Sequence, residues 1–347
     1  MPLRPLVQSR KTLLEAALLS CRRQWGELGV SARSGGGQRW EAGVIDPEAL
    51  LVFSLEVGRR DPRLFDGVLD WLVEHGPAID ISRLRRFVRV SPIAVRRLAA
   101  AVAEMLDSRL ADPKWTALAE TWIAEEADEP WEPQALFLGA DGEPQAPPEE
   151  PDELFARHGF LRAPLTLRGM TAPLPVRSPA LLRFRARALV GIGARAEVLT
   201  YLWTHEQAHG RLIHARSGYS QRIVAEYLSD LERAGFAEVR RAGGRQLDYS
   251  LTERLRLPEE DRVPYVDWAT FLPAYAALTR EAGALAREEL SAFIASSRLR
   301  RALRDLDEGL EAEGSRVRIG DLAQHSNEGL VQAWPAIAEE IAVGVRG

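Results

Sequence analysis

Two histidines and a glutamate in the middle of the chain have a spacing that could support metal chemistry. The segment His205–His209 reads His-Glu-Gln-Ala-His. On a helix, histidines four positions apart lie one turn from each other and can bind zinc, while the glutamate between them can act as a general base in hydrolysis. Such a site also needs an uninterrupted helix and a third protein ligand downstream.

The residues that follow argue against a hydrolytic zinc site. Gly210 and Arg211 come directly after the motif, where a zinc-protease helix continues with apolar residues. Glu226 and Glu232 are the candidates for a third ligand, but both fall in a helix to which we assign another role. We therefore expect no enzymatic activity, no metal and no cofactor.

A metal-sensing cluster is a second alternative for the histidines. His205, His209 and His214 lie within ten residues of one another, and no cysteine is close to them in the sequence. Exposed histidines without a metal are the simpler interpretation.

A second group of residues has the chemistry to contact DNA. Arginine can make two hydrogen bonds to guanine in the major groove, and glutamine can pair with adenine. Arginines near a hairpin tip can reach phosphates or the minor groove. The candidate DNA-binding residues are Ser220, Gln221, Arg222, Ala225, Glu226, Tyr227, Arg240, Arg241 and Arg245.

Three helices are expected to position the first six of these residues. Helices are predicted at residues 194–203, 212–216 and 221–234. The third has Val224, Leu228 and Leu231 on one face, and Ser220 is a suitable cap for its beginning. Gly218 can adopt the left-handed conformation that the preceding turn needs. The opposite, polar face of the third helix is then free for a DNA groove, with Tyr227 closer to the backbone.

Two strands are expected to position the remaining arginines. Residues 236–241 and 246–251 alternate between apolar and polar side chains, and the glycine-rich segment 242–245 separates them. This pattern predicts a β-hairpin.

The whole pattern resembles the winged helix-turn-helix of bacterial MarR- and ArsR-type transcriptional regulators. The similarity rests on Gly-Tyr-Ser at 218–220, on Leu-Glu-Arg-Ala-Gly-Phe at 231–236, and on Ala194–Leu202, which is similar to the helix that opens ArsR-type domains. It implies that the helix begun by Ser220 enters the major groove. His214 departs from the family, which usually has a small residue there.

The charge distribution favours the same region. The 347-residue chain has a formal net charge of −5. Eleven acidic residues and no basic residue lie between Glu125 and Glu153, together with six prolines, which predicts an exposed linker or long loop. Between Ser178 and Thr252, eleven arginines outnumber seven acids. An acidic protein that is basic in one stretch concentrates its attraction for phosphates there.

The rest of the chain is predicted to be helical. Before residue 124, a helix, a short helix and a serine-started helix with Arg96 and Arg97 outline either a degenerate second helix-turn-helix or a plain helical scaffold. After residue 258, three apolar stripes either complete the core or form a dimer interface. They are Trp268, Phe271, Leu272, Tyr275 and Leu278; Leu290, Phe293 and Ile294; and Leu299, Leu303, Leu306 and Leu310.

These observations predict a mainly α-helical protein with a small β-hairpin wing, in which a winged helix-turn-helix is flanked by helical domains. The expected units are residues 1–124, 125–177, 178–257 and 258–347. Cys21 is the only cysteine, and no apolar run is long enough for a membrane span, so we expect a cytoplasmic protein.

Double-stranded DNA is the expected partner, and the expected function is sequence-specific transcriptional regulation. A homodimer would match two DNA half-sites. The layout is also similar to that of AbiEi/MenA-type antitoxins, which implies a nucleotidyltransferase toxin as a protein partner. The alternative function is an antitoxin-like or scaffold protein whose winged helix and helical domains bind a protein.

Zinc analysis of the purified protein and of a His205→Ala variant tests both metal hypotheses. We expect no bound zinc in either protein, because the motif lacks a helical continuation and a third ligand. Stoichiometric zinc that is lost on His205→Ala would contradict this expectation.

Overall fold

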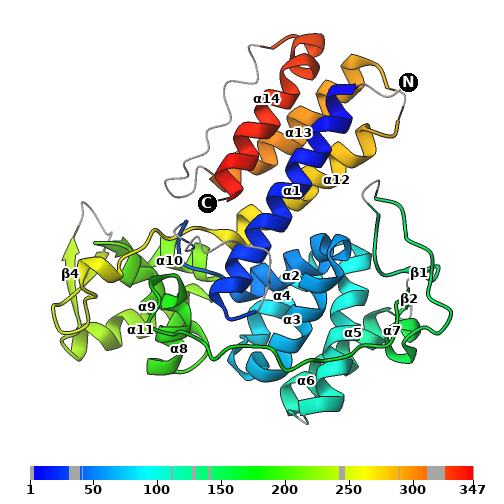
Figure 1. The fold of residues 1–347 in the computed structure, drawn as a ribbon. Coiled ribbons are helices and arrows are strands. Elements are labelled where there is room, and N and C mark those ends of the chain that lie inside the picture. Colours follow the sequence, from blue (N-terminus) through cyan, green and yellow to red (C-terminus); the bar gives the residue numbers. More distant parts are fainter. Residues whose placement is uncertain are drawn as a thin grey trace.

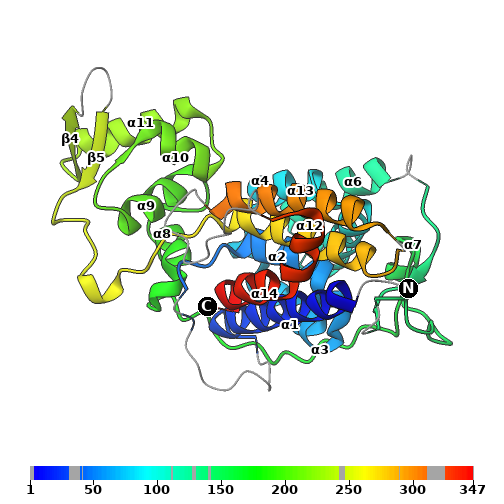
Figure 2. The ribbon, with the colours of Figure 1, turned by 90° about the horizontal axis from the view of Figure 1, so that it is seen from above.

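The computed structural model describes residues 4–30, 40, 42–110, 112–126, 130–139, 142–241, 247–288, 290–310 and 325–346. In these residues the protein is mainly helical, with one two-stranded and one three-stranded sheet. None of the helices in these ranges has the length and apolar character needed to cross a membrane. Figures 1 and 2 show a bundle of long helices, a second helical group beside it, and a smaller unit that carries the three-stranded sheet.

The second helical group is built from the first half of the chain. It contains α2 (Pro47–Val57), α3 (Pro62–His75), α4 (Ile81–Arg89), α5 (Ile93–Leu110) and α6 (Pro113–Glu126), with the short 3-10 turns η1 (Gly58–Arg60) and η2 (Gly76–Ala78). Asp46, Asp61 and Asp80 cap α2, α3 and α4 by accepting hydrogen bonds from backbone N–H groups of the first turn. These caps set where three consecutive helices begin.

The bundle of long helices is formed by segments from both ends of the sequence. It consists of α1 (Arg4–Glu27), α12 (Trp268–Leu285), α13 (Ala292–Leu310) and α14 (Asn327–Arg346). Helix α1 packs along α14 and also contacts α12 (Figure 1). The ranges 1–124 and 258–347 therefore do not form separate helical units, because α1 belongs with the helices that follow residue 267.

The predicted apolar stripes after residue 258 have different fates. All five members of the α12 stripe are buried, and so are Leu299, Leu303 and Leu306 on α13. Phe293 and Ile294 are 68% and 45% exposed, so Leu290 is the one member of the second stripe that packs against the core. The side chain of Leu310 lies outside the described residues.

The predicted linker, residues 125–177, has little regular structure in its described part but is packed on the core. It contains β1 (Gln134–Ala135), α7 (Glu153–Arg157) and β2 (Phe160–Leu161), and β1 pairs with β2 in parallel. Leu136, Phe155 and Phe160 are at most 1% exposed and belong to the main core. The acidic composition predicted exposure, but these three apolar side chains are buried, and Arg59 also donates to the carbonyls of Ala135 and Leu136.

The smaller unit, called here the α8–β5 unit, spans residues 182–251. Its elements are α8 (Leu182–Val190), α9 (Ala194–Thr204), β3 (Ala208–His209), α10 (Gly210–Ser217), α11 (Gln221–Arg233), β4 (Ala237–Arg241) and β5 (Leu247–Leu251). The 3-10 turns η3 (Pro179–Leu181) and η4 (Glu259–Asp261) flank it. Its antiparallel sheet has the order β3-β5-β4, with Val239 opposite Tyr249.

Two hydrophobic clusters correspond to these groups. The larger one joins the bundle, helices α2–α6 and the acidic segment. The smaller one lies inside the α8–β5 unit and includes Leu202, Ile213 and Leu228. Val44, which precedes α2, also belongs to the smaller cluster, so residues from outside the unit help to complete its core.

Replacing Phe155 with alanine tests whether the acidic segment is part of the core. We expect Phe155→Ala to lower the free energy of unfolding by about 3–5 kcal/mol, because a fully buried aromatic ring is lost. Met170→Ala, at a side chain that is 60% exposed, is the matched control and should change it by less than about 0.5 kcal/mol. Equal effects in urea denaturation would contradict the burial of Phe155.

Candidate nucleic-acid interface

Helix α11 has one buried apolar face. Val224, Leu228 and Leu231 are at most 5% exposed and pack into the smaller hydrophobic cluster. Ser220 caps the helix, since its side chain accepts a hydrogen bond from the N–H of Ile223 at 3.4 Å. The predicted cap and the predicted buried face are both present.

The opposite face of α11 is open to solvent. Ser220, Gln221, Arg222, Ala225 and Glu226 are all exposed. The Arg222 guanidinium contacts the Glu226 carboxylate at 2.7 Å, and their side chains are 77% and 58% exposed. A solvent-exposed ion pair of this kind contributes little stability, so Arg222 can exchange Glu226 for another anion at low cost.

Tyr227 lies at the edge of this face. It is half-buried, and the Arg195 guanidinium of α9 sits 5.7 Å from the centre of its ring. Burial raises the pKa of the Tyr227 hydroxyl, so the group stays protonated and can donate a hydrogen bond.

The hairpin places two of the three predicted arginines beside α11. Arg240 and Arg241 are exposed on β4, opposite Asp248 and Leu247 of β5. Arg245 lies outside the described residues. Arg240 has the acidic Asp248 opposite it, whereas Arg241 has the apolar Leu247. The positive charge of Arg241 is therefore less neutralised by its cross-strand neighbour.

The turn before α11 is docked on α4. Gly218 has φ +74°, the left-handed value predicted for it. The Tyr219 hydroxyl donates to the carboxylate of Asp80, and Arg86 donates to the Gly218 carbonyl. His214, the departure from the regulator pattern, has its Nδ1 2.6 Å from the Tyr219 carbonyl and thus helps to close the turn.

The histidine motif does not form a helix. Residue His205 has extended backbone after α9, and Ala208–His209 form β3. The His205 ring stacks on Tyr201 with centroids 3.9 Å apart, and His209 accepts a hydrogen bond from the Leu212 N–H at 3.1 Å. In the ranges that the structure describes, no three His, Cys, Asp or Glu side chains are grouped so that they could hold a metal ion.

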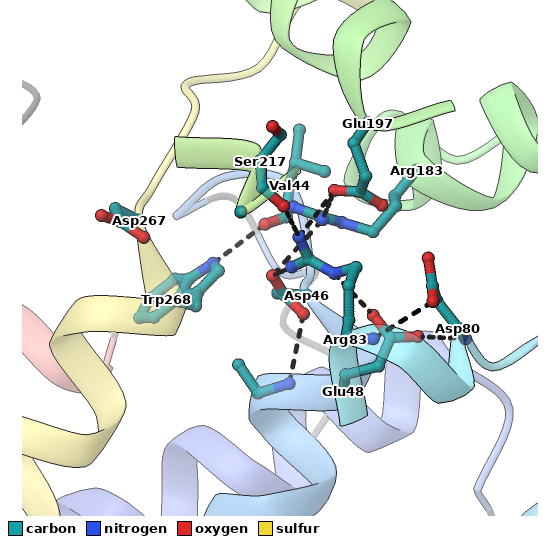
Figure 3. Close-up of polar contacts among 12 residues, drawn as sticks. Val44, Asp46, Glu48, Asp80, Arg83, Arg183, Glu197, Ser217, Asp267 and Trp268 are labelled. Carbon is teal, nitrogen blue, oxygen red and sulfur yellow. Dashed lines mark hydrogen bonds and ion pairs between the residues drawn. The ribbon is translucent and has the colours of Figure 1, made fainter. Parts of the chain in front are cut away.

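A buried charge network joins α2, α4, α8 and α9 and was not predicted from the sequence. It consists of Asp46, Glu48, Arg83, Arg183, Arg187 and Glu197. Figure 3 labels all of these residues except Arg187. Each of these residues is at most 6% exposed. Three carboxylates balance three guanidinium groups, so the set has no net charge.

Arg83 of α4 is at the centre of the network. Its guanidinium contacts Asp46, lies 3.3 Å from Glu48, and lies 3.1 Å from Glu197 of α9. It also donates to the carbonyl of Ser217, the last residue of α10, at 2.8 Å. One side chain thus joins the helices before residue 90 to two helices of the α8–β5 unit.

Helix α8 supplies the other two cations. Arg187 donates to both carboxylate oxygens of Glu48, at 2.8 and 2.9 Å, and reaches Glu197 at 3.1 Å. Arg183 contacts Glu197 and lies 3.3 Å from Asp46. Every carboxylate therefore faces at least two arginines, which offsets much of the cost of removing it from water.

The sequence contains only a weak signal for this network. Arg183 and Arg187 are four residues apart on a helix, and Arg83 precedes the apolar Leu84. Charged residues are usually on the surface, so such positions predict exposure. The partners are distant in the chain, and Glu48 and Arg187 are 139 residues apart.

Comparison with known proteins gave no match: no family model, no curated protein and no solved structure matches the chain. A function for the exposed face of α11 therefore rests on the geometry and chemistry of its own residues.

Replacing one carboxylate of the network with its amide tests its contribution to stability. Glu197→Gln leaves three buried arginines with two carboxylates, so we expect a loss of about 3–5 kcal/mol in the free energy of unfolding. The matched control is Glu226→Gln on the exposed face of α11, which should change it by less than about 0.5 kcal/mol. Urea denaturation that gives equal values for both variants would contradict the model of a tightly coupled network.

The network also predicts that the free energy of unfolding decreases at acidic pH. Burial on its own would raise the pKa of Asp46, but Arg183 and Arg83 outweigh it and lower that pKa to about 2. A carboxyl with a lowered pKa stabilises the folded state above its unfolded pKa of about 4 and loses this contribution as the pH falls toward 2. Between these limits the unfolding free energy should fall by about 2 kcal/mol more in the native protein than in Asp46→Asn. A control change, Asp230→Asn on the surface of α11, should retain the native pH profile.

Proposed function

We propose that this protein is a sequence-specific, double-stranded DNA-binding regulator of transcription that acts in the cytoplasm. In this proposal α9–β5 is a winged helix-turn-helix of the MarR or ArsR type. Helix α11 enters the major groove, and the β4–β5 hairpin is the wing.

The exposed polar face of α11 beside an arginine-bearing hairpin is the observation that carries the proposal. A recognition helix needs one face fixed on its own domain and the other open to a groove. Val224 and Leu228 meet the first condition, and Gln221 and Arg222 meet the second. The order of elements also supports the proposal, because the short strand β3 precedes α10 and pairs with the second strand of the hairpin.

The expected contacts follow from position on the helix. Gln221 and Arg222 are in the first turn, where side chains reach deepest into the groove, and they can read adenine and guanine. Ser220 is beside them, and Ala225 and Glu226 lie one turn later. Tyr227 contributes a hydroxyl to the backbone.

The wing arginines have a different role in the proposal. Arg240 and Arg241 contact phosphates or the minor groove, and Arg245 at the hairpin tip extends the same contact. These contacts supply affinity and register, while the residues of α11 supply sequence preference.

The alternative is that α11 binds a protein, as in an antitoxin-like or scaffold role. One observation favours it. The exposed part of α11 carries three carboxylates, on Glu226, Asp230 and Glu232, and only two arginines. Ile223 on the same helix is 38% exposed. An acidic face with an apolar residue suits a basic protein surface better than it suits the phosphates of DNA.

An electrophoretic mobility shift with the DNA upstream of the protein's own gene, at two salt concentrations, separates the two functions. We expect salt-sensitive binding, because arginines displace counterions from phosphates. Arg222→Ala should weaken specific binding by about 1–3 kcal/mol, and Arg241→Ala should weaken binding to all sequences and reduce the salt dependence.

The control variant is Arg109→Ala, which removes an exposed arginine of α5 outside the α8–β5 unit. It should leave DNA affinity unchanged. Binding that is absent, or that responds equally to Arg222→Ala and Arg109→Ala, would contradict the DNA-binding proposal.

A further inference from the structure

A cavity lies where α2, α12 and the end of α4 meet, away from the proposed DNA surface. On α2 it is lined by Ala49, Val52, Phe53 and Glu56, which follow the i, i+3, i+4, i+7 spacing of one helix face. A matching face of α12 includes Ala269, Ala276 and Arg280. The cavity has a volume of about 140 Å³.

Small side chains and a proline explain why the space is not filled. Ala49 and Ala276 are short residues on facing helices, so the two helices leave a gap between larger neighbours. Pro273 lies inside α12 and has no N–H, so it cannot donate to the carbonyl of Ala269 four residues before it. Both Pro273 and Ala269 line the cavity.

Two charged side chains line the cavity and are paired with each other. Arg280 of α12 contacts both carboxylate oxygens of Glu56 at 2.6 Å, and the Glu56 side chain is 19% exposed. The pair neutralises itself and places carboxylate oxygens next to an apolar interior. Glu56 and the Ala269 carbonyl are both hydrogen-bond acceptors.

From this geometry we propose that the cavity binds a neutral single-ring molecule that carries one O–H or N–H donor. An enclosed apolar cavity of about 150 Å³ is large enough for benzene, so a six-membered ring fits the observed volume, with one edge at the open side of the pocket where Val90 is 74% exposed. The apolar walls bind the ring, and the donor is directed to the Glu56 carboxylate or the Ala269 carbonyl. A charged group on the ligand would have no counterion, because Arg280 is already paired with Glu56.

The cavity is connected to the turn that begins α11. Phe87 of α4 forms one wall, and the guanidinium groups of Arg83 and Arg86 lie 5.3 and 5.2 Å from the centre of its ring. These two arginines donate to the carbonyls of Ser217 and Gly218. A ring bound against Phe87 thus acts, through two stacked arginines, on the turn before Ser220. This regulatory part of the inference rests on the proposed DNA-binding function.

Titration of the full-length protein with 4-fluorophenol, followed by ¹⁹F NMR, tests the binding site. We expect saturable binding that is at least about fivefold tighter than that of fluorobenzene, which has the ring but not the donor. Ala276→Leu fills the cavity and should abolish binding, whereas Ala277→Leu, at the next position of the same helix, should not. The absence of saturable binding, or equal binding of the two probes, would overturn the proposal even if Ala276→Leu does not fold.

Hydrogen exchange of residues 217–223 tests the connection without DNA. Saturating 4-fluorophenol should change their exchange rates at least about twofold, and Phe87→Leu should abolish this change while the probe still binds. Unchanged exchange at full occupancy would overturn the connection. Neither measurement requires DNA binding, so a failed mobility shift would contradict the proposed function alone.

Discussion

The position of the α8–β5 unit depends on six ionised side chains that are sealed from water. Transferring an isolated ion into a protein interior costs several kcal/mol, so such a set is stable only if every member is paired. Here Arg83 and Arg187 each bridge more than one carboxylate, and Glu197 on α9 is reached by all three arginines. A hydrophobic contact tolerates sliding, whereas these bonds hold only at one relative placement of α4, α8 and α9. The network therefore sets where α11 is presented.

Local features of the sequence predicted the elements around α11 well. The helices expected at 194–203, 212–216 and 221–234 correspond to α9, α10 and α11, and the alternating segments correspond to β4 and β5. Apolar periodicity, Ser220 and Gly218 encode these features within a few residues of where they act. The two-residue strand β3 was not predicted, because Ala208–His209 is too short to show a period.

Contacts between distant segments could not be read in the same way. An apolar stripe reveals which face of a helix is buried but not what buries it, so the packing of α1 against α14 was not expected. Phe155 and Phe160 follow directly after the acidic stretch 125–153, whose composition led to the prediction of an exposed linker. The candidate site was predicted at the level of individual exposed residues. The sequence did not indicate that the arginines of the charge network are buried, because charge usually indicates exposure.

The charge network takes residues both from the helices before residue 90 and from the α8–β5 unit, and this matters when the protein is cut into fragments. A fragment trimmed to residues 178–257 would retain Arg183, Arg187 and Glu197 but would lose Asp46, Glu48 and Arg83. The surface exposed by the cut would carry the two arginines and the one glutamate of the network. The core of the fragment would also lack the Val44 side chain. Such a fragment would acquire an artificial basic patch, and any affinity for polyanions measured on it would overstate that of the intact chain.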